Sequence, residues 1–159
     1  ENGAEFATAE ELLRRLNPNK DKNNPDNLTG RDKRFCRFNG AIGAEQVAWM
    51  RGQLAEAGKA GQRVMAFGHV PLHPNVSLPE CLLWNYEEVL SVLHEFDCVA
   101  AVITGHQHRA GYHVDDRGIH HLSLHAALET HSEREAFANF HVYSDRLELR
   151  GHGSIESRT

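Results

Sequence analysis

Two apolar segments constrain the fold of this chain more than any other feature of its sequence. Residues 63–67 (RVMAF) and 98–104 (CVAAVIT) are nearly continuous in apolar side chains, as is typical of strands buried on both faces. Between them, Asn85 and Glu88 predict a capping box that opens a helix whose apolar stripe extends to Phe96. This strand–helix–strand order predicts parallel strands joined by a crossover helix, and therefore an α/β fold.

Two more helices are predicted before the first of these strands. Thr8 and Glu11 have the spacing of a capping box, and an apolar stripe follows them as far as Leu16. Pro18 then stops the helix. The second helix is predicted over residues 43–56, where apolar side chains again recur on one face.

A long polar segment separates these two helices. Residues 17–34 (NPNKDKNNPDNLTGRDKR) are rich in turn-forming residues. A connection of this length inside a compact domain is usually either functional or disordered, and the sequence leaves both alternatives open. The chain has no internal repeat or domain boundary, so residues 1–159 are expected to form one unit with a substantial core.

The last third of the chain alternates apolar and polar residues, which predicts antiparallel strands with one solvated face. Residues 112–114 and 119–124 flank the turn sequence DDRG, which predicts a hairpin. Residues 137–143 and 146–150 flank a second turn and predict another.

Charge and composition exclude some function classes. The formal net charge of −5 argues against a nucleic-acid-binding surface, and no stretch approaches the roughly 20 apolar residues of a membrane span. Cys36, Cys81 and Cys98 form no C-x-x-C pair, which favours a reducing compartment. Sequons at Asn27 and Asn75 oppose this only weakly, so a cytoplasmic location is expected.

Both apolar strands run directly into a glycine and a histidine. The first leads into Gly68-His69, and the second into Gly105-His106, with His108 two residues further on. Ligands of open α/β sheets bind beyond the carboxyl ends of the strands, and neutral imidazole is a common metal ligand. We therefore expect His69, His106 and His108 to converge as a metal site. Seven of the other histidines are expected to be ordinary hydrogen-bonding residues: His113, His120, His121, His125, His131, His141 and His152.

The three histidines are compatible with two kinds of metal site. They could form a zinc site with an open fourth position, or half of a two-metal site that also needs carboxylates. No obvious carboxylate partners are present, because Asp115 and Asp116 fall in a predicted hairpin turn and Glu129 has no motif around it.

The motifs GHVPLHP and GHQH, together with LNPNKDKNNP, RFCRFNGAIGAEQVAWM and CLLWNYEEVLSVL, carry a family likeness. From about Phe6 to Gly153 the chain resembles the manganese-dependent ADP-ribose/CDP-alcohol diphosphatases of the calcineurin-like metallophosphoesterase superfamily. The resemblance implies a four-layer α/β/β/α sandwich, of which this chain is the C-terminal portion. The protein is then expected to be a monomer when intact, with no nucleic-acid or membrane partner.

The resemblance also implies a reaction and a cofactor. A nucleotide diphosphate compound such as ADP-ribose or CDP-choline would be hydrolysed at its diphosphate bond, with two Mn²⁺ ions, or Zn²⁺ or Mg²⁺ in their place. His69 and His106 would bind one metal ion and His108 the other. The block CLLWNY suggests a substrate-binding role for Cys81, Trp84, Asn85 and Tyr86.

One departure from the family pattern is severe. The Asp, Gly-Asp and Gly-Asn-His motifs that supply the other metal ligands in the family are absent, so no complete catalytic set is present. Two divalent ions without a bridging carboxylate would repel each other strongly. The chain alone is therefore expected to be weakly active or inactive. The alternative is a catalytically inactive remnant that binds a metal, a nucleotide or another protein.

Overall fold

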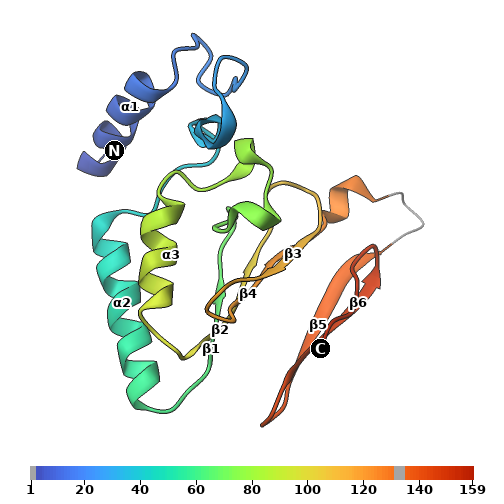
Figure 1. Ribbon diagram of the computed structural model, residues 1–159. Coiled ribbons are helices and arrows are strands. Elements are labelled where there is room, and N and C mark those ends of the chain that lie inside the picture. The colour runs from blue at the N-terminus through green and yellow to red at the C-terminus, as the bar shows by residue number, and fades with distance from the viewer. Residues whose placement is uncertain (1–2, 131–134) are drawn as a thin grey trace.

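A computed structural model describes residues 3–130 and 135–159. Three α-helices, four short 3₁₀ helices, one mixed four-stranded sheet and one two-stranded sheet make up the regular structure of these residues (Figure 1). The helices are α1 (Ala4–Leu16), α2 (Ala44–Lys59) and α3 (Tyr86–His94). The strands are β1 (Val64–Phe67), β2 (Val99–Thr104), β3 (Gly111–Val114), β4 (His120–Ser123), β5 (Ala136–Val142) and β6 (Leu147–Gly153). None of the described helices has the length and apolar character needed to cross a membrane.

The predicted parallel pair is confirmed and forms one side of the four-stranded sheet. The strand order is β1-β2-β4-β3, with β1 parallel to β2 and α3 as the crossover between them. β4 also runs parallel to β2, whereas β3 pairs with β4 as an antiparallel hairpin. The carboxyl ends of β1, β2 and β4 therefore lie at the same edge of the sheet.

The sheet has a different covering on each face. α2 and α3 cover one face, where Leu54 and Leu93 pack with Val102. The β5–β6 hairpin lies on the other side, where Ile103 and Leu149 belong to a second apolar cluster. Helices α2 and α3, the mixed sheet and the hairpin sheet thus form three successive layers, and α1 lies apart from them, packed against Phe35 and Trp84 (Figure 1).

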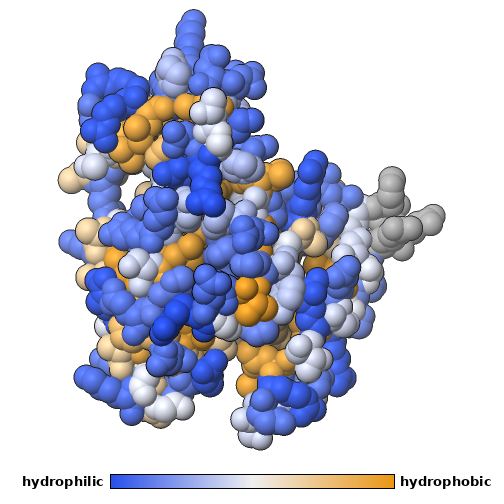
Figure 2. Space-filling view, viewed as in Figure 1, coloured by the Kyte–Doolittle hydropathy of each residue, from blue (hydrophilic) through white to orange (hydrophobic). Residues whose placement is uncertain are grey.

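Strand β1 is more exposed than its apolar sequence predicts. Its residues are only partly buried, and Phe67 is 66% exposed. The reason is that β1 is the edge strand of the sheet formed by the described residues, with β2 as its one neighbour. A cavity of about 750 Å³ lies between the two sheets, with Met65, Phe67 and Phe140 in its wall. The molecular surface is notched beside the hairpin, and apolar side chains edge the notch (Figure 2).

The predicted helices are present, but neither predicted capping box forms. α1 begins before Thr8, and the Thr8 hydroxyl donates to the carbonyl of Ala4. The Asn85 side chain makes no cap bond to a backbone amide of α3; it instead binds Ile42 and Glu88. These side chains have the capping pattern but are used for other bonds.

The polar segment 17–34 has a defined conformation rather than a disordered one. Asn17 is fully buried, and its side-chain amide donates to the carbonyl of Phe35 at 2.8 Å and to that of Asn24 at 3.2 Å. The same side chain accepts from the backbone amide of Asn19 at 2.9 Å. One buried asparagine therefore adds to the backbone hydrogen bonds of the segment, which include those of the 3₁₀ helix Gly30–Arg34.

Both predicted hairpins are confirmed, and the first carries a buried polar cluster at its turn. Asp115 Oδ2 accepts from His121 Nε2 at 2.8 Å and from His94 Nε2 at 2.9 Å. The His73 ring lies against His113 and His121, with ring centroids 4.6 Å apart in both cases. Four imidazoles and one carboxylate thus tie α3 and the β3–β4 hairpin to the segment that follows β1.

This cluster predicts a loss of stability in acid. Burial, together with neighbouring His121 and His113, lowers the pKa of His73 to about 4 from an ordinary 6.5. Burial alone would raise the pKa of Asp115, but hydrogen bonds from His121 and His94 lower it overall. The unfolded chain therefore binds protons that the folded chain does not, so stability present above pH 6.5 is lost as the pH falls towards 4.

Urea denaturation at several values between pH 7 and pH 4 would measure this slope. The variant His73→Gln is expected to flatten it, because one of the shifted groups is removed. His141→Gln serves as the control, since His141 lies on β5 outside the cluster. A slope in His73→Gln as steep as that of the unaltered chain would contradict the assignment.

Candidate metal centre

His69 and His106 meet at the carboxyl ends of β1 and β2. The two turns are joined through the backbone, because Gly105 N donates to the carbonyl of His69 at 3.0 Å. His69 Nε2 lies 3.2 Å from His106 Nδ1. The parallel pairing of the strands thus places two imidazoles, 37 residues apart in the sequence, in direct contact.

The turn that carries His106 and His108 has an unusual backbone. Both residues are left-handed, with φ of 65° and 61°, and no other non-glycine residue in the described ranges has a positive φ. This conformation costs roughly 1–2 kcal/mol per residue for an L-amino acid. Such strain tends to occur at functional sites, where the surrounding structure holds it in place.

Gln107 supplies part of that support. Its side-chain amide donates to the carbonyl of Val76 at 2.6 Å and to that of Arg109 at 2.9 Å. Its oxygen accepts from the backbone amide of Leu78 at 2.8 Å. The residue between the two histidines therefore binds the turn to the segment that follows β1.

His69, His106 and His108 line one cavity, but His108 has a hydrogen-bond partner of its own. The cavity has a volume of about 410 Å³, and its wall includes four histidines: His69, His106, His108 and His125. His108 Nδ1 donates to a carboxylate oxygen of Glu129 at 2.9 Å. His108 is therefore oriented by an acidic residue, while His69 and His106 face each other.

Sequence reasoning missed three residues of this site. His125 follows β4, whose polar sequence gives a weaker strand signal than β1 or β2. Glu129 has no motif but lies 2.9 Å from His108. Asn39, from the segment before α2, accepts from His106 Nε2 at 2.9 Å. The last two are separated from their histidine partners by 21 and 67 residues, so no local pattern could identify them.

The donors present are suited to part of a metal centre. Bonds of about 2 Å to one divalent ion place neighbouring ligand nitrogens about 3 Å apart, close to the observed His69–His106 spacing. Burial, and then His69 and His108, lower the pKa of His106, which favours the neutral form that can bind a metal. However, no three His, Cys, Asp or Glu side chains within the described ranges are grouped to hold an ion by themselves.

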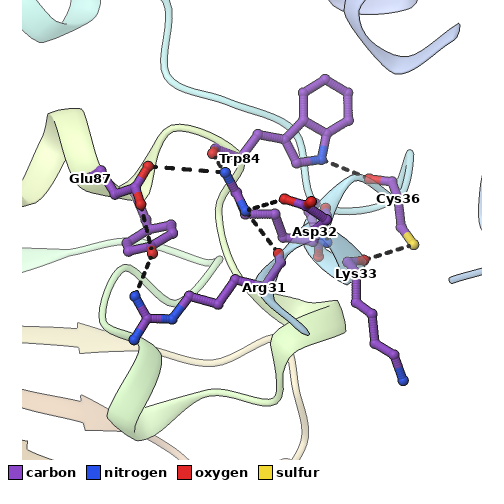
Figure 3. Close-up of polar contacts among 9 residues, drawn as sticks. Arg31, Asp32, Lys33, Cys36, Trp84 and Glu87 are labelled. Carbon is purple, nitrogen blue, oxygen red and sulfur yellow. Dashed lines mark hydrogen bonds and ion pairs between the residues drawn. The ribbon is translucent and has the colours of Figure 1, made fainter. Parts of the chain in front are cut away.

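Trp84 and Tyr86 are buried structural residues in this conformation. The Trp84 indole nitrogen donates to the carbonyl of Cys36 at 2.9 Å (Figure 3). Arg34 Nε donates to the Trp84 carbonyl at the same distance. The Tyr86 hydroxyl accepts from Arg31 at 3.0 Å. With only 5% and 2% of their surfaces exposed, neither aromatic ring presents a face for a nucleotide base.

The other two residues of this block also have local roles. Asn85 pairs with both the backbone amide and the carbonyl of Ile42. Cys81 is partly buried, and burial raises the pKa of its thiol. The carbonyl of Glu80, the residue before Cys81, accepts from Asn39, which in turn contacts His106, so one residue links the start of this block to the histidine pair.

The fold of the described residues is an α/β architecture that is also found in a dimetal phosphatase. A crystal structure of a dimetal phosphatase from Danio rerio has this architecture, with a TM-score of 0.95 and 34% identity over 99% of this chain and 51% of that one. No protein-family model matches the chain.

The chain is a relative of proteins named manganese-dependent ADP-ribose/CDP-alcohol diphosphatase. The protein of that name from Oryza sativa subsp. japonica is 42% identical over 91% of this chain and 45% of its own length. Those from Arabidopsis thaliana and Homo sapiens are 40% and 35% identical, each over 92% of this chain. The chain spans only 45%, 47% and 42% of the three relatives' lengths, so it is similar to less than half of each.

Proposed function

We propose that this chain is the C-terminal half of a metal-dependent hydrolase that cleaves the diphosphate bond of ADP-ribose, CDP-choline and related compounds. The observation that carries the proposal is the His69–His106 pair, with both histidines of the G-H-x-H turn held in a left-handed backbone. The names of the relatives support the substrate class and the choice of Mn²⁺ over Zn²⁺ or Mg²⁺.

In this proposal the residues of the chain hold and orient ligands. His69 and His106 would hold one ion, and His108, oriented by Glu129, would face the second. Bound Mn²⁺ would supply positive charge that stabilises the charge developing on the phosphoryl oxygens. Water adds across the diphosphate bond of ADP-ribose, releasing AMP and ribose 5-phosphate. The segment at Cys81, near the histidine pair, is the part of its block that we assign to substrate contact.

The carboxylate ligands would come from the half of the relatives that this chain does not cover. Two features support such a completion: β1 has an unpaired side among the described residues, and a cavity of about 750 Å³ with Met65 and Phe67 in its wall lies beside it. Strand pairing at β1 would cover the exposed Phe67. All three cysteines are free, which supports a reducing, cytoplasmic location for the protein.

Fragment complementation tests this proposal. The chain would be mixed with the amino-terminal half of the Oryza sativa relative, and AMP release from ADP-ribose would be followed with Mn²⁺, Zn²⁺ or Mg²⁺. We expect Mn²⁺-dependent hydrolysis from the mixture and little or none from either half alone. If the mixture forms a complex that stays inactive, the reading as an inactive binding remnant replaces the proposal.

A further inference from the structure

We propose that Asn39 is a positioning residue that fixes the ring tautomer of His106 and thereby keeps the Nδ1 lone pair directed at His69. The inference rests on the proposed metal site and identifies a residue on which that site depends. Asn39 belongs to no metal-binding or substrate-binding motif of the sequence. It precedes His106, its hydrogen-bond partner, by 67 residues.

The orientation of the Asn39 amide is set by its own bonds. The residue is 5% exposed, and Nδ2 donates to the carbonyl of Arg34 at 2.7 Å and to that of Glu80 at 2.8 Å. A carbonyl oxygen can only accept, so the nitrogen of the amide must face these two groups. The oxygen of the amide must then face His106, from which it lies 2.9 Å.

This orientation determines which nitrogen of His106 carries the proton. An amide oxygen has no hydrogen to give, so His106 Nε2 must be the donor in this bond. In the neutral ring, Nδ1 is then left with a free lone pair, and this atom lies 3.2 Å from His69 Nε2. Metal-binding histidines commonly donate their second nitrogen to such an oxygen, which fixes the ring and raises its basicity.

Asn39 also connects His106, at the carboxyl edge of the sheet, to two other segments. Arg34 ends the 3₁₀ helix Gly30–Arg34, and Glu80 lies in the short helix Pro79–Cys81. Both carbonyls lose a donor if Asn39 is replaced by alanine, so that variant alone does not separate a structural role from positioning. Asn39→Asp separates the two, because a carboxylate still accepts from His106 Nε2 but no longer donates to the two carbonyls.

Two measurements on the chain itself test the inference. Nitrogen-15 NMR reports the tautomer of His106 through the shifts of its two ring nitrogens. A Mn²⁺ titration gives the ion concentration that half-broadens the His69 and His106 imidazole signals. Asn39→Ala is expected to give a mixture of tautomers and to weaken Mn²⁺ binding about 10- to 100-fold. Asn39→Asp should keep the Nε2-protonated form and bind Mn²⁺ nearly as well as the unaltered chain.

Asn139→Ala is the matched control, since Asn139 is exposed on β5 and makes no side-chain hydrogen bond among the described residues. The inference is overturned if His106 of the unaltered chain carries its proton on Nδ1, a result that needs no variant to fold. It is also overturned if both Asn39 variants lose Mn²⁺ affinity equally, because the role is then structural. If the unaltered chain shows no Mn²⁺ broadening at either histidine, the metal site itself fails, whereas the tautomer result stands separately.

Discussion

His106→Ala is expected to lower Mn²⁺-dependent hydrolysis of ADP-ribose by the complemented enzyme at least about 100-fold. Removing even an outer partner of a metal ligand typically costs 10- to 100-fold, so the loss of a ligand should cost no less. The substitution removes the imidazole that faces His69 at 3.2 Å and also frees the Asn39 oxygen. Part of the loss should be recovered at high Mn²⁺ concentration if weakened metal binding is the cause.

His141→Ala is the control for this experiment, because His141 lies on β5 and outside the cavity that contains His106. Initial rates of AMP release at limiting and saturating Mn²⁺ would be compared for the two variants. Equal rates for His106→Ala and His141→Ala at limiting Mn²⁺ would remove His106 from the metal site.

Asp115→Asn is expected to lower the free energy of unfolding by about 3 kcal/mol, the range for breaking a buried charged network. The Asp115 side chain is 4% exposed and accepts four hydrogen bonds: from His94, His121 and the backbone amides of Arg117 and Ile119. An asparagine amide turns a donor toward groups that are themselves donors. At least one buried bond is therefore lost.

The neighbouring residue gives a matched control. Asp116 is exposed and makes no hydrogen bond among the described residues, so Asp116→Asn makes the same chemical change without the network. Urea denaturation at pH 7 would compare the two variants with the unaltered chain. If Asp115→Asn is no less stable than Asp116→Asn, the buried cluster does not stabilise the fold.

The sequence predicts the framework of this fold because its strongest signals are periodic. Continuous apolar runs locate β1 and β2, the helical stripe locates α3, and alternation around turns locates both hairpins. The exposure of Phe67 could not be predicted from the run alone, because burial of an edge strand depends on neighbours elsewhere. The capping patterns at Thr8 and Asn85 failed because both side chains find other partners.

The candidate site was predictable only where a residue type that binds metals follows the end of a predicted strand. Gly-His junctions after two parallel strands locate His69 and His106, because the topology brings such ends together. Asn39 and Glu129 come from segments with no comparable signal, and only tertiary packing brings them to the histidines. Trp84 has an aromatic side chain that could stack on a base, but its indole belongs to an apolar cluster with Leu13 and Phe35.

The left-handed backbone at His106 and His108 has a consequence for how the site responds to a ligand. A strained main chain at these two residues is held by the surrounding structure and not by a bound ion. The turn is therefore preorganised: the free energy of arranging it is spent during folding, and an arriving ion need not supply it. Binding of the ion should in turn stabilise this conformation further, so the turn should resist local unfolding more strongly as the Mn²⁺ concentration rises.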